Sequence, residues 1–461
     1  MAEGANGPDD QERDAPDPIT RALITAVTDA TEARDPDAAA TAMADLHVAD
    51  LADLIEQLRQ DQRIAFLSLV WPAIDKDFLA ELQENVRDQI LSELDPALLA
   101  EAVKELDTDD AVYVLEGLQD AAQEVVVEAL EPAERAVISK SLTYPEYSAG
   151  RLMQSDFVKA PPFWTVGQMI DEMRSADALP EQFYDIVVVD PAMRPLGKIA
   201  LGRLLGSPRP VTLASLMSDD TRTLHVEDAQ EDVAYAFNHY HLVSCPVVDD
   251  EGRVVGVITI DDAMEALEDE AEEDIKRLGG VGDEEINDRV WSITRRRFPW
   301  LAVNLLTAIL ASAVIALFDT VIAQYVALAV LMPIVASMGG NAGTQTLTVA
   351  VRAIATRDLT ASNMWRVIWR EAAVGLINGL GFALLIGAAA GLVYGSAILA
   401  AVIAAAMVVN MLVAGLAGIL IPIGLEKIGA DPALASGTFV TTVTDVVGFF
   451  AFLGLAAVFL L

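Results

Sequence analysis

The C-terminal part of the chain contains apolar runs that carry no charge and are long enough to cross a lipid bilayer. From Trp291 onward there are only 6 acidic and 8 basic side chains. The preceding residues carry 63 acidic and 22 basic side chains, so the net charge of −39 lies almost entirely there. A hydrocarbon core about 30 Å thick is spanned by about 20 apolar helical residues. The sequence therefore predicts a membrane region that follows a long, acidic soluble region.

Charged residues, and an uncharged glycine-containing turn at 391–396, divide the membrane region into five predicted spans. These spans are 298–318, 320–351, 372–392, 397–422 and 433–461. The second is too long for one untilted crossing and contains GGNAGTQ, which predicts a glycine break near its end. Arginines gather at the ends that the positive-inside rule assigns to the cytosol. This pattern predicts an N-terminus in the cytosol and a C-terminus outside.

Asp445 is the only charged residue in the last predicted span. A charge near the bilayer centre costs about 2.5 to 3.5 kcal/mol even on lenient scales, so such residues face water or a partner. Thr438, Thr441 and Gly448 share its face at helical spacing and form an oxygen-rich stripe. Pairing with a basic residue is the alternative, but no Lys, Arg or His lies deep inside another apolar run. The stripe favours a cation as the partner of this carboxylate.

The soluble region changes its pattern near residue 149. Residues 19–148 have apolar positions at helical spacing with short breakers, which predicts an all-α, solenoid-like domain. Residues 149–267 alternate β-branched runs with helices, and two runs about sixty residues apart share one order of strand, VVD, turn and strand. This is an internal repeat in an α/β domain. Residues 1–18 form an acidic, Pro-rich tail, predicted to be disordered, that lacks the features of a signal peptide.

The segment DDAMEALEDEAEEDIKRLGG, at Asp261–Gly280, predicts a helix with an unusual density of carboxylates. Most acidic runs are solvated helix faces, and an acid-rich, Lys-poor chain can also reflect a saline cytosol. This run, however, lies just before the membrane region and follows an acidic helical domain. Carboxylates that approach one another repel unless a divalent cation lies between them, and hard cations prefer oxygen ligands. A cation-dependent contact is therefore the alternative to a solvated face.

Several motifs resemble the MgtE family of magnesium channels, and the likeness covers the chain from about residue 45 onward. The segments are AGRLM, CPVVDDEGRVVGVITIDDAMEALEDEAEEDIKRLGG, GGNAGTQT, RAIATRDL, DPALASG and TDVVG. The resemblance implies a multidomain chain with a helical N domain at 19–148, tandem CBS domains at 149–267, an acidic connector and plug helix at 268–297, and a five-helix transmembrane domain at 298–461. The plug helix falls at about 283–297. Two chains would form a homodimer in a prokaryotic inner membrane, with the ion path between them.

The resemblance also assigns roles to individual residues. Asp445 matches the family's pore aspartate, and Thr441 would offer a backbone carbonyl to hydrated Mg²⁺. Asn341, Thr438 and Gly448 would line the pore; alternatively, Asn341 satisfies backbone groups freed by the helix break. The residues that match regulatory Mg²⁺ positions are Asp262, Glu265, Glu270, Glu273 and Asp274. In the N domain the candidate sensor acids are Asp107, Asp109 and Asp110. High cytosolic Mg²⁺ would bridge the N and CBS domains and close the pore.

Nucleotide binding by the CBS pair is a secondary hypothesis. The second half keeps Gly256, Thr259 and Asp262 at the spacing that nucleotide-binding CBS modules use to hold a ribose. The first half has Ala200 and Arg203 instead. Asp262 could therefore serve either an adenine nucleotide or the regulatory Mg²⁺.

Two other functions fit parts of the pattern. A proton- or sodium-coupled divalent cation transporter would use Asp445 for the coupling ion and would need a second titratable partner. Glu371 is a second acid at the edge of a span and, beside Arg370, predicts an interfacial anchor. A nucleotide-sensing CBS membrane protein would use its spans only as anchors, which does not explain the Asp445 stripe. The sequence has no nucleophile with an adjacent base and no phosphate-binding loop, so neither an enzyme nor a nucleic-acid partner is expected.

Overall fold

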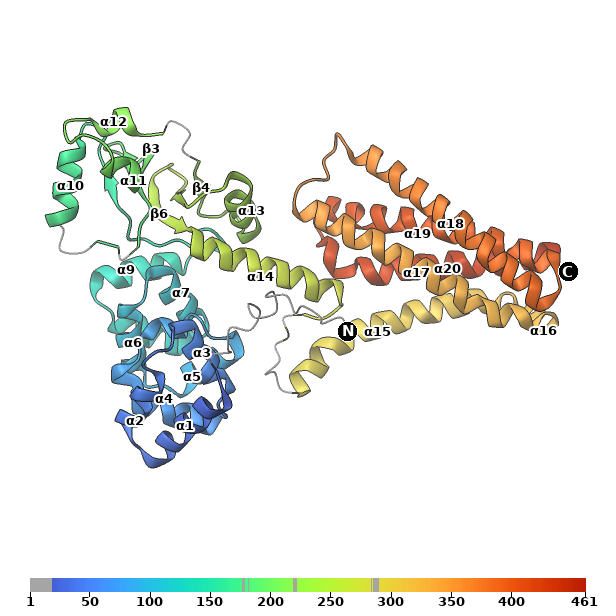
Figure 1. Cartoon of the computed structure of the whole chain (residues 1–461), viewed down its shortest axis with the longest axis horizontal. Helices are drawn as coiled ribbons and strands as arrows, with labels where there is room; N and C mark the ends of the chain where they lie inside the picture. Colours follow the sequence, from blue (N-terminus) through green and yellow to red (C-terminus); the bar gives the residue numbers. More distant parts are fainter. Residues whose placement is uncertain (1–18, 176–178, 181, 219–221, 283, 285–289) are drawn as a thin grey trace, which may run out of the picture. The chain divides into compact units, whose positions relative to one another are not determined.

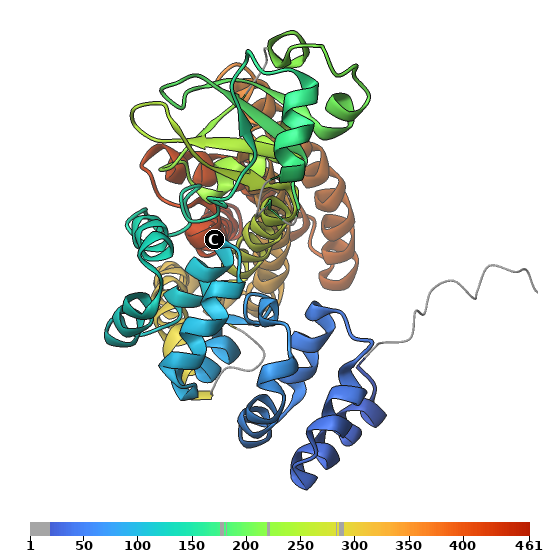
Figure 2. The ribbon, with the colours of Figure 1, turned by 90° about the vertical axis from the view of Figure 1, so that its left-hand side faces the viewer.

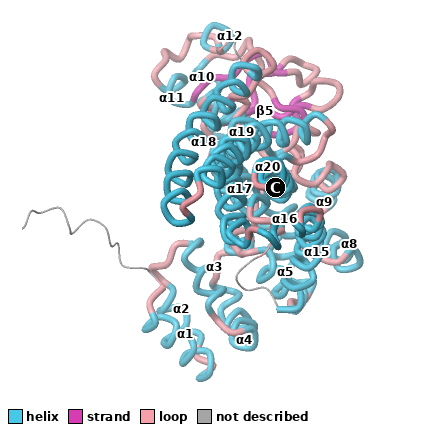
Figure 3. Tube along the Cα trace, turned by 90° about the vertical axis from the view of Figure 1, so that its right-hand side faces the viewer, coloured by secondary structure: helices cyan, strands magenta, loops and turns pink. Residues whose placement is uncertain are grey.

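The computed structural model of this chain contains two compact units, Met1–Glu268 and Asp269–Leu461 (Figure 1). It describes residues 19–175, 179–180, 182–218, 222–282, 284 and 290–461, with the side chains of 434–436 excepted. The predicted disordered tail at 1–18 lies outside the described residues, as do residues 283 and 285–289 of the predicted plug helix. Within the described part of the chain, strands occur only in the first unit (Figure 3).

The first unit begins with a stack of short helices, coloured blue to teal in Figure 2. They are α1 (Arg21–Ala33), α2 (Pro36–Met43), α3 (Val48–Gln57), α4 (Gln60–Val70), the 3₁₀ turns η1 (Trp71–Ala73) and η2 (Lys76–Leu79), α5 (Glu84–Glu93), α6 (Pro96–Glu105), α7 (Thr108–Glu116), α8 (Asp120–Ala129) and α9 (Pro132–Ser141). Asp35 and Asp95 cap helices that start with proline, which needs no hydrogen-bond partner at that position. Apolar side chains from the whole stack form one core. The predicted all-α domain is confirmed.

Two copies of a small α/β module complete the first unit. Their strands are β1 (Lys159–Ala160), β2 (Asp185–Val189), β3 (Pro195–Ala200), β4 (Leu224–His225), β5 (Ser244–Val248) and β6 (Val254–Thr259). Their helices are α10 (Val166–Ser175), α11 (Leu201–Leu205), α12 (Leu213–Leu216), α13 (Gln230–Tyr240) and α14 (Ile260–Leu278). Each three-stranded sheet has one parallel and one antiparallel pair, and each has a bulge at the same step, Val188/Val189 and Val247/Val248. This equivalence confirms the internal repeat.

The acidic segment predicted to be helical at 261–280 is α14. It begins directly after β6, and its residues from Asp269 onward belong to the second unit. Only Ala263 and Ala266 are fully buried along it, so most of its carboxylates face outward. The single helix therefore continues from the second CBS module into the connector.

The second unit is made of long apolar helices. They are α15 (Val290–Ala316), the short α16 (Asp319–Gln324), α17 (Val326–Ala355), α18 (Met364–Tyr394), α19 (Ala397–Lys427) and α20 (Pro432–Phe459). Five of them are long and apolar enough to cross a membrane, which confirms the five predicted spans. Residues 290–297 of the predicted plug helix continue without a break into the first span.

The glycine break predicted in the second span is wrong, because α17 is continuous through Gly339–Gln345. The glycines permit close helix packing instead. A Cβ atom on Gly339 would lie 2.2 Å from the amide nitrogen of Asn410 in α19, and one on Gly343 would lie 2.5 Å from Val440 in α20. Small residues at such contacts are the usual means by which membrane helices approach one another.

Candidate functional site

Asp445 lies in the middle of α20, and its carboxylate is partly exposed. Within the described part of the chain it accepts no hydrogen bond and forms no ion pair. The acid–base pair that was the alternative is therefore not found among the described residues. A carboxylate inside a membrane span needs water or a cation to compensate its charge.

The stripe around Asp445 is only partly open. Thr441 is partly exposed, and its hydroxyl donates to the carbonyl oxygens of Gly437 at 3.0 Å and Thr438 at 3.1 Å. The carbonyl oxygen of Thr441 accepts a hydrogen bond from the Thr444 hydroxyl at 3.0 Å in addition to the backbone hydrogen bond of helix α20, so both of its lone pairs are used. Thr438 is 6% exposed and donates to Asn304 of α15 at 2.7 Å, so its hydroxyl is turned toward α15.

Residues on α17 and α19 surround this face of α20. A Cβ atom on Gly340 would lie 3.9 Å from the methyl carbon of Thr441, so the GGNAG segment runs beside the stripe. Asn341 is exposed, and since α17 has no break, the role of satisfying freed backbone groups does not apply to it. Gly448 faces Asn410, whose amide donates to the carbonyl of Val335 at 2.7 Å, while its own oxygen is buried and has no hydrogen-bond partner among the described residues.

Asn410 was missed in the sequence, although the signal was present. It is a polar amide inside a long apolar span, the same kind of exception that identifies Asp445. It is fully buried at the contact of α17, α19 and α20. It therefore belongs to the packing behind the stripe.

A second cluster of carboxylates lies in the first unit, between the helical domain and the second CBS module. Asp109 and Asp110 come from the first turn of α7, and Asp262 and Glu265 come from the first turns of α14. Asp109 interacts with Asp262 through a side-chain hydrogen bond. The negative charges of Asp262 and Glu265 both repel Asp110. Asp77 and the candidate Asp107 lie near enough to add to the repulsion. Five of the acids singled out in the sequence, Asp107 among them, are thus brought together.

The pKa values of Asp109, Asp110 and Asp262 are all raised, because these carboxyls are buried beside other acids. Burial, followed by repulsion from Asp262 and Glu265, raises the pKa of Asp110 from 3.8 to about 8. Burial and the charge of Asp262 also raise the pKa of Asp109, which is 8% exposed and has one carboxylate oxygen that no described residue hydrogen-bonds. Burial raises the pKa of Asp262, opposed by the Thr259 hydroxyl at 2.5 Å. A proton or a metal cation would relieve this repulsion.

The other predicted regulatory acids lie further along α14, in the second unit. Glu273 forms an ion pair with Arg277, which also pairs with Asp431 at the start of α20. Glu270 and Asp274 have partners as well. Within the second unit the end of α14 is thus tied to α20 by an arginine, because one guanidinium serves carboxylates on both helices.

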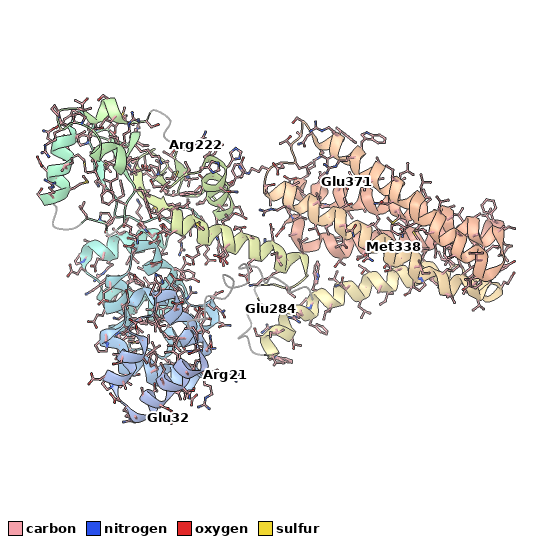
Figure 4. The ribbon with its side chains drawn as sticks, viewed as in Figure 1. Arg21, Glu32, Arg222, Glu284, Met338 and Glu371 are labelled. Carbon is pink, nitrogen blue, oxygen red and sulfur yellow. The ribbon has the colours of Figure 1, made fainter. Side chains whose placement is uncertain are left out.

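The CBS modules contain a polar cavity that the sequence did not indicate. It has a volume of about 380 Å³ and is lined by Asp185, Lys198, Ser218, Arg222, Tyr240, His241, Leu242 and Val243. Lys198 donates to Asp185 at 2.8 Å and to the carbonyl of Ser244 at 2.9 Å, which links the two halves. Arg222, labelled in Figure 4, stacks on Tyr240 with its guanidinium carbon 3.4 Å from the ring centre. The sequence did contain a signal for this cavity, because Asp185 and Lys198 are charged residues in otherwise apolar strands.

No three His, Cys, Asp or Glu side chains are close enough together to enclose a bare metal ion, as far as the structure describes the chain. The carboxylates of the acid cluster lie near one another without forming such a set, and the Asp445 stripe offers one carboxylate with hydroxyls and carbonyls beside it. Such sites suit a cation that keeps most of its water, as Mg²⁺ does.

Comparisons with known proteins agree with this architecture. Residues 332–455 match the model of a divalent cation transporter family, residues 46–147 match the MgtE intracellular N domain, and residues 213–269 match the CBS domain. The chain is 32% identical over 449 residues to the magnesium transporter MgtE of Thermus thermophilus, covering 95% of this chain and 98% of that protein. The chain belongs to the MgtE family.

Other relatives extend the comparison. The magnesium transporter MgtE of Bacillus subtilis is 27% identical over 413 residues, which cover 89% of this chain and 91% of that protein. The crystal structure of the cytosolic domain of the Mg²⁺ channel MgtE in complex with ATP is 29% identical, with a TM-score of 0.50 over 53% of this chain and 100% of that one. MgtE proteins are membrane transporters, a class distinct from enzymes.

Proposed function

We propose that this MgtE protein carries Mg²⁺ into the cell along a path lined by Asp445 from two copies of the chain. The observation that carries the proposal is that the carboxylate of Asp445 lies within the last span and has no partner among the described residues. Two such carboxylates balance one divalent ion, and Mg²⁺ gives up water reluctantly, so contact through its hydration shell is the expected mode. The relatives named as magnesium transporters support this choice of ion. The N-terminus would lie in the cytosol and the C-terminus outside.

The surroundings of Glu371 favour this function over a proton- or sodium-coupled carrier. Arg370 donates to one oxygen of Glu371 at 3.1 Å, and Thr346 donates to the other at 3.2 Å. A coupled carrier needs a second carboxylate that can gain and lose an ion during each cycle. Glu371 is already held by a guanidinium and a hydroxyl, so a structural role suits it better.

The cytosolic acid cluster supports regulation by the transported ion. Bound Mg²⁺ would bridge Asp109 and Asp110 of α7 to Asp262 and Glu265 of α14 and hold the helical domain against the CBS module. Loss of Mg²⁺ would leave like charges in contact, and their repulsion would separate the two domains. The acids Glu270, Glu273 and Asp274 would extend this response toward the membrane. High internal Mg²⁺ would thus close the path.

An adenine nucleotide is a second ligand that the CBS pair could hold. The cavity of about 380 Å³ is of the size of small-molecule sites and presents Lys198, Arg222 and Tyr240. The related cytosolic domain solved with ATP supports this assignment. We expect ATP to raise the unfolding temperature of the wild type and not of an Arg222→Ala variant. Equal shifts for both proteins would place the nucleotide elsewhere.

Magnesium flux into proteoliposomes tests the pore. We expect Asp445→Asn to lower the initial rate by at least about tenfold, which corresponds to about 1.4 kcal/mol of lost ion stabilisation. Asp319→Asn is the matched control, because Asp319 is an exposed acid at the start of α16 rather than within α20. A wild-type rate for Asp445→Asn would refute the assignment of this carboxylate.

A further inference from the structure

A cavity of about 390 Å³ lies at the end of the membrane unit where α17, α18 and α19 meet. Its apolar wall is formed by Val349, Ala353, Leu359, Val367 and Ile419. Figure 4 labels Glu371, another lining residue, close to the loop that joins α17 to α18. The cavity therefore combines an apolar surface within the helices with an opening near a polar loop.

Among the described residues, the charged groups at this opening leave Arg366 without an ion-pair partner. Arg366 and Arg370 of α18 both line the cavity. Arg370 pairs with Glu371, while Asp358 accepts a hydrogen bond from a neighbouring threonine at 2.8 Å. Arg366 is exposed and forms no ion pair with the residues that the structure describes. Between residues 352 and 371 there are four arginines and two acids, so the segment has a net positive charge.

Two tryptophans place this opening at the surface of the bilayer. Trp365 and Trp369 are 66% and 72% exposed and lie one turn apart at the start of α18. Exposed indole rings at the end of a membrane span gather at the level of lipid headgroups. Arg366 follows Trp365 in the sequence, and Arg370 follows Trp369. Each arginine therefore lies at nearly the same depth in the bilayer as the tryptophan before it.

We propose that this cavity binds one anionic phospholipid of the cytoplasmic leaflet. Arg366, with Arg370 beside it, binds the headgroup phosphate, since guanidinium matches phosphate oxygens with paired hydrogen bonds. An acyl chain covers the apolar wall. Basic pockets between membrane helices on the cytoplasmic side are suited to such headgroups. A free phosphate would leave the apolar wall uncovered, and a zwitterionic lipid would bring its own cation toward Arg366.

Native mass spectrometry of the full-length protein, titrated with phosphatidylglycerol, tests this proposal. EDTA is present throughout, because Mg²⁺ can itself bridge phosphates to carboxylates. We expect Arg366→Gln to bind the lipid about fivefold more weakly, which corresponds to about 1 kcal/mol for one arginine near the surface. Arg352→Gln is the matched control, since Arg352 is an exposed arginine near the end of α17 that does not line the cavity. Ala353→Leu fills the apolar wall without changing charge and should also weaken binding.

The same titration has three results that would overturn the proposal. Equal binding of phosphatidylcholine would mean that the cavity accepts any bilayer lipid. Displacement of phosphatidylglycerol by inorganic phosphate alone would indicate a site for a soluble anion. Equal losses of lipid affinity in Arg366→Gln and Arg352→Gln would mean that general surface charge, and not the cavity, attracts the lipid.

Discussion

Replacing Asp110 with asparagine tests whether the cytosolic acid cluster is pushed apart by its own charge. Burial and the neighbouring Asp262 and Glu265 raise the pKa of Asp110 from 3.8 to about 8. Because the folded pKa is above the unfolded value, the folded state binds more protons in this window, and stability falls as the pH rises from about 4 to about 8. Four pKa units would correspond to roughly 5 kcal/mol, and screening at this partly exposed carboxyl reduces the estimate to about 1 to 3 kcal/mol.

We therefore expect Asp110→Asn to stabilise the contact of α7 with α14 at about pH 8 in EDTA and to have a smaller effect at about pH 5, where Asp110 is still protonated in the folded state. Mg²⁺ should also stabilise the contact, because a bound cation relieves the same repulsion. At a hundredfold excess over its dissociation constant it should stabilise the wild type by about 2.7 kcal/mol at about pH 8, and should stabilise the variant less.

Hydrogen–deuterium exchange of the full-length protein measures this effect directly. Peptides from α7 and α14 report the local contact, once intrinsic exchange rates are corrected for pH. Glu101→Gln is the matched control, because Glu101 is an exposed acid on α6 without a place in the cluster. Equal gains in protection for Asp110→Asn at both pH values, or equal protection of both proteins by Mg²⁺, would show that charge repulsion does not open the contact.

Two further predictions concern helix packing and regulation. Gly418→Ala should destabilise the protein in detergent by about 1 to 3 kcal/mol, because its Cβ would lie 2.7 Å from the backbone oxygen of Gly343. Gly424→Ala on the same helix has nothing within 4 Å and should be neutral in the same unfolding assay; equal losses would contradict the packing argument. In the flux assay, neutralising three acids of α14 should weaken inhibition by internal Mg²⁺ while preserving transport, and unchanged inhibition would exclude them as sensors. That triple variant carries Glu270→Gln, Glu273→Gln and Asp274→Asn.

The sequence by itself determined the order of the structural parts. Five spans, two repeated α/β modules and the acidic helix α14 all follow from patterns of consecutive residues. Helical spacing, alternation and uninterrupted hydropathy are local properties, so they are visible without any tertiary contact. Asp445 could be singled out for the same reason, because a charge in an apolar run is anomalous wherever the helices pack.

Only the tertiary structure decided what the individual polar and glycine residues do. The glycines around Asn341 do not interrupt α17 and let it approach α19 and α20 closely, an effect that depends on which side chains face them. Thr438 belongs to the Asp445 stripe by spacing, yet its hydroxyl bonds to Asn304 on α15. Asp110 and Asp262 lie far apart in the sequence, and their repulsion exists because folding places α7 beside the start of α14. Spacing along a helix assigns a residue to a face, whereas folding decides what that face meets.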